Sequence, residues 1–260
     1  MFHEKYPLAW VFHRNTSRWP FNMQAVPAAP SQTAPYKEYY NAPLIPLPEP
    51  RPPAITLSDA IAARRSCRRF THAPLKTLEL ATLLKATYGI QGRIFFPEQE
   101  FLERPVPSGG GLYPLELYLI VQRVEGIEPG IYHYAVLQHA VEQIRSLVLP
   151  MRFTSELFMG QPYVAEAAAI VMLAAVLERS LWKYGDRGYR YILLEAGHVA
   201  QNLNLMAAAI GLGSLNLGGF FDSDMANLLA LDMEQEVPVY GIALGMPASA
   251  DRTELRQPTD

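Results

Sequence analysis

Residues 188–212 read GYRYILLEAGHVAQNLNLMAAAIGL and form the longest amphipathic stretch in the chain. Its apolar residues recur at alternating steps of four and three, at Ile192, Ala196, Val199, Leu203, Met206 and Ile210. Such steps place side chains on one face of an α-helix, so this stretch predicts a long helix with an apolar face. We expect that face to pack into the core.

Other elements are predicted outward from this helix. Buried strands are predicted from apolar runs at 115–124, 168–177 and 237–244, a hairpin at 130–134 and 140–144, and shorter helices from Thr56 to Arg64 and from Thr77 to Gly89. Helices and strands are thus interspersed, with a hairpin in the middle and no regular βαβ repeat. This order predicts an α+β fold.

Prolines recur every few residues between Pro27 and Pro53. Proline lacks a backbone donor and disrupts helices, so this segment is predicted to be an extended arm that packs on its own domain or on a partner. Regular structure is predicted to start at Thr56. We therefore divide the chain into a proline-rich arm, residues 1–55, and a folded domain, residues 56–260.

The composition excludes several classes of protein. The net charge is −3, so neither nucleic acid nor an anionic membrane is expected as a general partner. Cys67 is the sole cysteine of the sequence, which excludes an internal disulfide and fits a reducing cytoplasm. Residues 1–19 lack the pattern of a secretion signal, and the apolar run at 167–177 is too short to span a bilayer.

Glu195 and His198 have the Glu-x-x-His spacing of carboxylate-bridged metal bundles. Such sites need a second copy of the motif and further carboxylates, which the sequence lacks. We therefore expect no metal, and interpret both residues, with Asn202, as a polar stripe on the long helix.

Residues 182–190, WKYGDRGYR, place the amine of Lys183 beside the phenol of Tyr184, just before the long helix. Cations nearby disfavour the charged form of a lysine, so that its neutral amine can accept a proton. Arg187 and Arg190 are candidates for those cations. The pair is thus a candidate proton-transfer site, and an ordinary surface loop is the alternative.

The two arginines of this motif also have a second interpretation. Arg187 could pair with Asp186, and Arg190 with Glu195, which would order the entrance to the helix. The sequence leaves both interpretations open.

Residues 64–70, RRSCRRF, gather four guanidinium groups and a hydroxyl. Arginine binds phosphate oxygens through paired hydrogen bonds, so this segment is a candidate phosphate clamp. A solvated basic turn or a patch for acidic partners is the alternative. Cys67 stands among these charges, but no accompanying His or Asp motif supports a nucleophilic role.

Two glycine-rich segments would let a flat ligand approach the backbone. Residues 104–114, RPVPSGGGLYP, place three glycines before a strand without the Lys of a P-loop; a flexible hairpin is the alternative. Residues 211–220, GLGSLNLGGF, follow a helix and carry Asn216 at the third glycine position of a dinucleotide fingerprint, so a Rossmann site is rejected. Close approach at Gly218 and Gly219 is still expected.

Together these segments resemble the nitroreductase superfamily, and within it the SagB-type dehydrogenases, which include the azoline oxidases of thiazole and oxazole peptide biosynthesis. The resemblance runs from about residue 56 to residue 247. Its markers occur in family order, with RRSxRxF at 64–70, PSGGGLYP at 107–114, PGIYHY at 129–134, WKYGDRGYR at 182–190, EAGHVAQN at 195–202 and GGF at 218–220. Their joint order carries the resemblance.

The resemblance implies a nitroreductase-like sandwich with a mixed or antiparallel central sheet flanked by helices. It also implies FMN and a homodimer that binds flavin at the subunit interface. The implied phosphate and ribityl ligands are Arg64, Ser66 and Arg68, with Arg65 as an addition. The implied neighbours of the isoalloxazine ring are Pro107, Ser108 and Gly109, with the amides of Gly218 and Gly219 near its N5.

In azoline oxidases of this branch a Lys-Tyr pair is associated with catalysis, and it corresponds here to Lys183 and Tyr184. We expect this pair to remove a ring proton while hydride passes to the flavin, which oxygen reoxidises. The function implied is two-electron oxidation of a heterocycle or a related C–N bond in peptide natural-product biosynthesis. The alternatives are an NAD(P)H-dependent nitro or ene reductase and a non-catalytic scaffold of a biosynthetic complex.

Three features depart from the family pattern. Gly111 and Tyr113 stand where typical nitroreductases carry Asn and Gln, which disfavours nitroreductase activity. Arg252 and Arg256 are candidates for the C-terminal phosphate ligands. The arm of about fifty-five residues is shorter than the peptide-recognition domain of some azoline oxidases, so a partner protein is expected to present the peptide or carrier-bound substrate.

Overall fold

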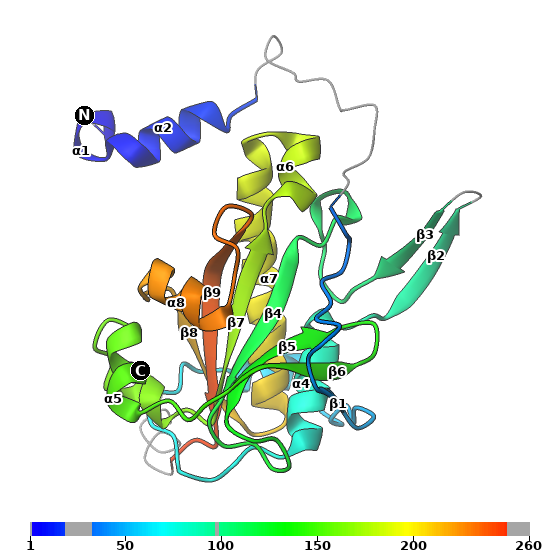
Figure 1. Cartoon of the computed structure of the whole chain (residues 1–260), viewed down its shortest axis with the longest axis vertical. Helices are drawn as coiled ribbons and strands as arrows, with labels where there is room; N and C mark the ends of the chain where they lie inside the picture. Colours follow the sequence, from blue (N-terminus) through cyan, green and yellow to red (C-terminus); the bar gives the residue numbers. More distant parts are fainter. Residues whose placement is uncertain (1, 19–32, 97–98, 249–260) are drawn as a thin grey trace.

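The computed structural model describes residues 2–18, 33–96 and 99–248 (Figure 1). Its centre is a seven-stranded sheet with the order β1-β6-β5-β4-β7-β9-β8, in which neighbouring strands are antiparallel. The strands are β1 (Leu44–Pro46), β4 (Leu115–Val121), β5 (Gly130–Ala135), β6 (Ala140–Ser146), β7 (Ala169–Val176), β8 (Gly213–Leu217) and β9 (Glu236–Gly245). The predicted α+β class and its central antiparallel sheet are confirmed.

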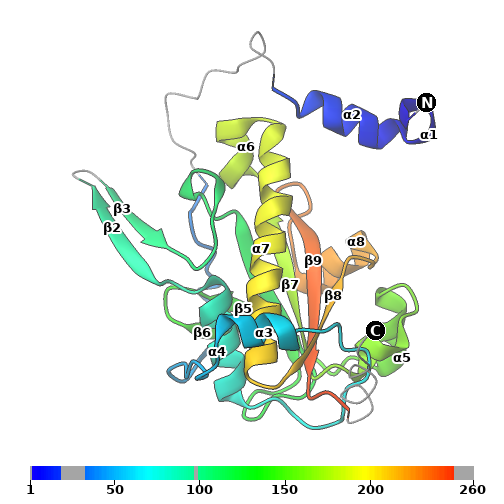
Figure 2. The ribbon, with the colours of Figure 1, turned by 180° about the vertical axis from the view of Figure 1, so that it is seen from behind.

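Helices cover both faces of this sheet. One face carries α3 (Leu57–Ala63), α4 (Thr77–Tyr88) and α7 (Arg187–Ala209), and α7 runs along the strands (Figure 2). The other face carries α5 (Met151–Leu157) and α8 (Asp222–Leu229). The remaining described elements are α1 (Phe2–Lys5), α2 (Pro7–Asn15), α6 (Glu178–Tyr184), the hairpin β2 (Gly92–Phe96) and β3 (Gln99–Glu103), and the 3-10 turns η1 (Gly109–Gly111) and η2 (Pro162–Glu166).

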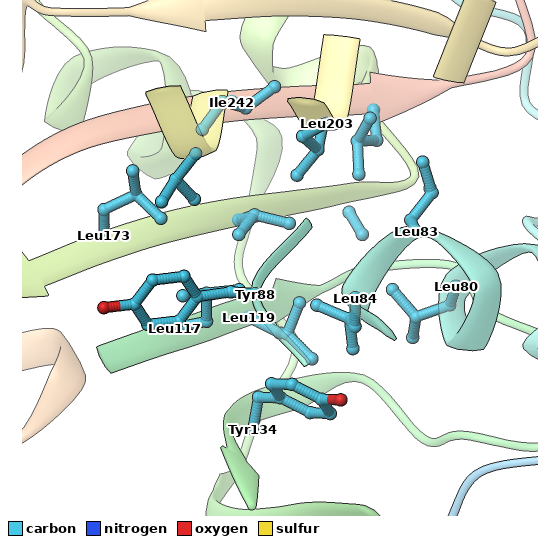
Figure 3. Close-up of a cluster of buried hydrophobic side chains, with 14 of the residues drawn as sticks. Leu80, Leu83, Leu84, Tyr88, Leu117, Leu119, Tyr134, Leu173, Leu203 and Ile242 are labelled. Carbon is cyan, nitrogen blue, oxygen red and sulfur yellow. The ribbon is translucent and has the colours of Figure 1, made fainter. Parts of the chain in front are cut away.

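Alternate residues of the central strands enter two separate cores, because successive side chains of a strand point to opposite faces. Leu117 and Leu119 of β4 pack with Leu84 of α4 and Leu203 of α7 (Figure 3). Tyr118 and Ile120 of β4 belong to the second core, which α5 and α8 cover. Both faces are buried, which explains why these strands are continuous apolar runs in the sequence.

The long helix, the predicted strands and hairpin, and the helices after Thr56 and Thr77 are confirmed. Thr56 caps its helix by accepting the N–H of Asp59 at 3.1 Å. The prediction that regular structure starts at Thr56 is wrong, because α1, α2 and β1 precede it. Sequence reasoning also missed β8, since its five residues lie inside a glycine-rich segment and pair with β9, a strand distant in the sequence.

The described part of the arm packs on its own chain, one of the two predicted alternatives. β1 pairs with β6, the Nε of Arg179 donates to the carbonyl of Ala34 at 2.9 Å, and Lys37 forms a 2.6 Å ion pair with Glu236. α2 lies beside the start of α7, where the ring of Phe12 meets that of Tyr189 edge to face. The arm is thus fastened to the sheet at several points.

A chain of buried charges contributes to this attachment. Glu116 accepts from Arg179 at 2.7 Å, from His133 at 3.0 Å and from the backbone N–H of Lys37 at 3.0 Å, while the other ring nitrogen of His133 lies 2.7 Å from Glu142. Burial alone would raise the pKa of Glu116, but the hydrogen bond with His133 and the charge of Arg179 outweigh it and lower this pKa to about 2. Glu116 is therefore the anionic centre of the cluster.

Two kinds of feature are absent from the described ranges. None of the helices there combines the length and the apolar character needed to cross a membrane. Within the same ranges, three or more His, Cys, Asp or Glu side chains are nowhere grouped so as to hold a metal ion.

Candidate functional site

The motif at 182–190 forms a corner between two helices. Lys183 and Tyr184 occupy the last turn of α6, Gly185 ends that helix with a φ of 55°, and α7 starts at Arg187. The pair therefore lies at the end of a helix and not in a loop, and both side chains are half-buried. The turn holds the amine and the phenol on a fixed element.

The glycine loop, residues 107–111, meets this corner. A Cβ added to Gly110 would lie 2.6 Å from the Tyr184 hydroxyl and 3.0 Å from the Lys183 amine. The φ of Gly110 is 70°, in the left-handed region that favours glycine. Both polar atoms thus converge on a stretch of backbone where other residues do not fit.

Neighbouring contacts fix the shape of the glycine loop. A Cβ on Gly109 would lie 3.3 Å from the ring of Tyr191, and that ring packs edge to face on Tyr184 at 4.9 Å. Ser108 Oγ accepts the backbone N–H of Tyr113 at 2.9 Å, which closes the turn. The turn thus fixes the backbone of the loop, and the rings of Tyr184 and Tyr191 pack against it. Pro107, at the start of the loop, is exposed.

Arg187 and Arg190 bind the N-terminal helix, so their predicted pairing with Asp186 and Glu195 is wrong. Arg187 donates to Tyr191 Oη at 3.1 Å and to the carbonyl of Thr16 at 2.8 Å. Arg190 donates to the hydroxyl of Thr16 and to the carbonyl of His13, the latter at 2.7 Å. Residues from the far end of the sequence supply these acceptors, which local spacing could not indicate.

The N-terminal segment also reaches the candidate pair itself. The guanidinium of Arg18, just after α2, donates to the backbone carbonyl of Tyr184 at 2.6 Å. This bond satisfies a carbonyl at the end of α6, where the helix offers no partner. The arm therefore contributes to the position of the corner.

The basic segment at 64–70 lies along the start of β8. Ser66 forms a bridge with Ser214, and the N–H of Cys67 donates to the carbonyl of Ser214 at 2.9 Å. The side chain of Cys67 is buried against Gly213, so Cys67 packs in the core. The hydroxyl-bearing Ser66 is exposed beside it.

The arginines of this segment differ in their surroundings. Arg65 donates to the carbonyls of Ala62 and Arg64, each at 2.8 Å, so its guanidinium closes the end of α3. Arg64 is half-buried and Arg68 is exposed. The other candidates for phosphate ligands, at 252 and 256, lie outside the described residues.

Gly218 and Gly219 follow the opposite end of β8. Gly218 lies four positions after Ser214, a distance of about 13 Å along a strand. A Cβ on Gly218 would find only Tyr240 within 4 Å, at 3.8 Å, so this backbone is accessible. Cationic side chains and side-chain-free backbone thus lie at the two ends of one strand.

The glycine loop and Gly218 lie toward the same end of the sheet. Leu115, which follows the loop, pairs with Ala175 at the end of β7, and Leu217, the last residue of β8, pairs with Gly241 in the middle of β9. β4 and β8 are three strand spacings apart, or about 14 Å. Lys183 and Tyr184 contact Gly110. Gly218 lies toward the end of the sheet that carries the glycine loop, and Ser66 lies toward the opposite end.

Sequence reasoning missed the burial of Glu195 on α7. Its side chain accepts from the Tyr88 hydroxyl at 2.6 Å. Burial raises the pKa of Glu195 to about 7, although this hydrogen bond and the nearby hydroxyl of Ser108 favour the ionised form. The predicted polar stripe is divided, since Asn202 donates to the carbonyl of Pro105 at 3.2 Å while His198 is exposed. The sequence signal that could have indicated this burial is the position of Glu195 directly beside Ala196, a residue of the apolar face of the helix.

Comparison with known proteins identifies the family of the chain. A nitroreductase-family model matches residues 61–246. A protein of Methanocaldococcus jannaschii named as a nitroreductase is 37% identical over 194 residues, which cover 74% of this chain and 91% of that protein. The microcin B17-processing protein McbC of Escherichia coli is 33% identical over 152 residues, and the trifolitoxin-processing protein TfxB of Rhizobium leguminosarum is 30% identical over 137 residues. The matches cover 54% of McbC and 37% of TfxB, so the chain spans about half of the first and less of the second.

Solved structures give the same result. A nitroreductase-like protein of Anabaena variabilis superposes with a TM-score of 0.68 at 28% identity, covering 88% of this chain and 49% of that one. A chain of the E. coli microcin synthetase complex McbBCD, solved with truncated pro-MccB17 bound, superposes with a TM-score of 0.60 at 24% identity, covering 95% and 86%; this match shows the shared fold alone. The family model covers most of the folded part. The chain therefore belongs to the nitroreductase family.

Proposed function

We propose that this protein is an FMN-dependent oxidase or dehydrogenase that converts an azoline-type heterocycle, or a related C–N bond, to its oxidised form in peptide natural-product biosynthesis. The convergence of Lys183 and Tyr184 on Gly110 carries the proposal, because it places a proton acceptor beside accessible backbone. Similarity to two peptide-processing proteins, McbC and TfxB, supports the substrate class.

The residues present fit a flavin mononucleotide. This cofactor has a phosphate at one end and a flat ring at the other, and β8 has basic residues near its start and glycine backbone past its end. Arg64, Ser66 and Arg68 would hold the phosphate, and the amides of Gly218 and Gly219 would face the ring. When bound, FMN would supply the two-electron acceptor.

Lys183 and Tyr184 would manage the proton of the reaction. Aromatisation of an azoline removes one proton and one hydride from adjacent ring carbons and forms one C=C bond. The hydride leaves with both electrons of its C–H bond, so the chain must accept only the proton, for which an amine is suited. The ring centroid of Tyr184 lies 5.6 Å from the Lys183 amine. The Tyr184 hydroxyl would orient the azoline ring of the substrate by a hydrogen bond.

A homodimer with flavin at the subunit interface is part of the proposal. In one chain the glycine loop contacts α7 at Tyr191, whereas β8 contacts it at Asn204, about 20 Å further along the helix. α2 has no buried residue, and Leu193 and Leu194 of α7 are exposed apolar residues nearby. A second copy would cover this surface and bring the separated motifs together. Sedimentation velocity should show a dimer, and a monomer at micromolar concentration would contradict this part.

Partner proteins are also proposed to present the peptide or carrier-bound substrate. The relevant observation is that a structurally similar chain occurs in the McbBCD complex with pro-MccB17 bound.

The colour of the purified protein tests the proposed function. An oxidase of this kind should be yellow, bleach without oxygen when given an azoline peptide, and recolour in air, while the peptide loses two hydrogen atoms. Bleaching by NAD(P)H without reaction of the azoline would indicate a nitro or ene reductase instead. A colourless protein that takes up no flavin would reject both and leave the scaffold.

Replacement of two arginines should weaken flavin binding. Arg64→Ala with Arg68→Ala removes two proposed phosphate contacts, each a charge-assisted hydrogen bond worth about 1.5 kcal/mol or more, so FMN affinity should fall by about 100-fold. Fluorescence titration with FMN and with riboflavin measures it, and only FMN binding should weaken. Arg65→Ala is the matched control, because its guanidinium already donates to carbonyls. An equal loss in the control would contradict the assignment.

A methyl group at Gly110 should impair catalysis more than one at Gly111. Both glycines have positive φ, of 70° and 67°, so alanine costs each about 1–2 kcal/mol of backbone strain. Only Gly110→Ala meets Lys183 and Tyr184; Gly111→Ala meets nothing within 4 Å. We expect similar losses in melting temperature but at least a tenfold greater loss of azoline oxidation for Gly110→Ala. Equal activities of the two variants would show that the contact is unimportant.

A further inference from the structure

Glu195 is a buried carboxyl that no proposed catalytic step uses. It lies on α7 and is 2% exposed. One oxygen, Oε1, accepts from the Tyr88 hydroxyl at 2.6 Å, while Oε2 is buried without a hydrogen-bond partner. The buried Glu116 and Glu142, by contrast, each bind His133. A buried carboxyl with one unpartnered oxygen lowers the stability of the fold. Its presence therefore points to a role in binding a proton.

The groups that face Glu195 come from three elements. Tyr88 belongs to α4, Ser108 to the glycine loop, and Arg104 to the segment before that loop. Burial raises the pKa of Glu195 to about 7, and the nearby hydroxyl of Ser108, the hydrogen bond from Tyr88 and the charge of Arg104 oppose the rise. Glu116 acts on the neighbouring Tyr88 and Arg104 by its charge. The carboxyl therefore changes its protonation near neutral pH.

Ser108 connects this carboxyl to the ligand side of the loop. Its oxygen already accepts the N–H of Tyr113 at 2.9 Å, and it has one hydrogen to donate. An ionised Glu195 can only accept, so it attracts that hydrogen. A protonated Glu195 has its own hydrogen to donate to the second lone pair of Ser108, which releases the serine hydrogen toward a ligand on the loop.

We propose that Glu195 is a positioning residue that directs the hydroxyl of Ser108 either into the protein or toward the flat ligand on the glycine loop. The proposal rests on the proposed function, because that ligand is taken to be the ring of FMN. Glu195 itself does not touch the ligand. Protonation of Glu195 should therefore strengthen ligand binding through Ser108.

The pH dependence of FMN affinity tests the proposal on the ligand-free protein. Fluorescence titrations from about pH 5.5 to about pH 8.5 span the neutral range in which the carboxyl titrates. Affinity should fall about fivefold as pH rises through this range, the equivalent of one hydrogen bond. In Glu195→Gln the amide always donates to Ser108 while still accepting from Tyr88, so affinity should remain at its low-pH value. The FMN phosphate also titrates in this range, but it affects both proteins alike. The ratio of their FMN affinities at each pH therefore reports on Glu195.

Two further variants keep the test decisive if Glu195→Gln is poorly folded. Tyr88→Phe removes a hydrogen bond that favours the carboxylate, so the step in affinity should move to higher pH. Ser108→Ala should give a weak affinity without a step. Glu156→Gln on the exposed surface of α5 should retain the step of the unmodified protein.

The outcomes separate the two proposals. Parallel pH curves for the unmodified protein and Glu195→Gln, or a step in Tyr88→Phe that does not move, would overturn the role of Glu195 alone. An absence of FMN binding at every pH would overturn the proposed function and this inference with it.

Discussion

Replacement of Lys183 by Met together with Tyr184 by Phe is expected to lower the rate of azoline oxidation by about 10²–10⁴-fold without loss of bound flavin. General acid-base groups contribute factors of this size. Both side chains point at Gly110, so the variant removes the proposed proton acceptor and its neighbouring phenol at once. The conservative shapes keep the packing of Tyr184 on Tyr191. Single-turnover bleaching of the flavin by an azoline peptide measures the chemical step directly.

Tyr189→Phe is the matched control for this prediction. It removes a phenol hydroxyl from the same corner, but the ring of Tyr189 contacts Phe12 of α2. Its rate should therefore stay within about twofold of the unmodified protein. The single variants Lys183→Met and Tyr184→Phe should each cost nearly as much as the pair, because groups that act as a unit are not additive. Undiminished bleaching in the double variant would exclude the pair from catalysis.

Glu116→Gln is expected to cost about 3 kcal/mol of stability, the largest effect on folding that we predict. Glu116 is buried and pairs with the buried Arg179 and with His133, and removal of one charge leaves the others uncompensated. For a chain of this length the melting temperature should fall by about 10 °C. The N-terminal arm should also loosen, because the N–H of Lys37 donates to Glu116. Thermal unfolding and amide hydrogen exchange at residues 34–46 measure the two effects.

The exposed pair Arg152–Glu156 provides the control for Glu116→Gln. Its ions face solvent, so Glu156→Gln should leave the melting temperature unchanged. A comparable loss in both variants would show that burial of Glu116 has no special weight.

The same cluster predicts how stability depends on pH. The folded pKa of Glu116 is about 2, below the unfolded 4.5, so its contribution is present above pH 4.5 and is lost as pH falls toward about 2. The pKa of His133 is raised by its hydrogen bonds to Glu116 and Glu142, which outweigh burial, so its contribution is present below pH 6.5 and is lost as pH rises through the folded value. In Glu116→Gln the loss on the acid side should shrink, and unfolding measured at several pH values shows whether it does.

Much of the fold was predictable because its signals are local. The apolar steps of the long helix, the cap at Thr56 and the stop at Gly89 lie within the elements that they define. β8 was missed for the opposite reason. Its strand character comes from pairing with β9, more than twenty residues later in the chain.

The candidate site shows the same division. The types and order of its residues, from the basic run at 64–70 to the glycines at 218–219, were evident from the sequence and led to the correct family. The partners of Arg187 and Arg190 were predicted wrongly, because Thr16 and His13 lie more than 170 residues away. Spacing along a chain contains no information on such contacts.

The sequence by itself determined the long helix, the apolar strands at the centre of the sheet, the α+β class and the inventory of reactive groups, since these depend on periodicity and on residue chemistry. Only the tertiary structure brought Lys183 and Tyr184 against Gly110, which precedes them by more than seventy residues. Only burial under Tyr88 and the glycine loop turned Glu195 from one residue of a polar stripe into a carboxyl that titrates near neutral pH. Desolvation and convergence depend on which surfaces meet, and packing alone decides that.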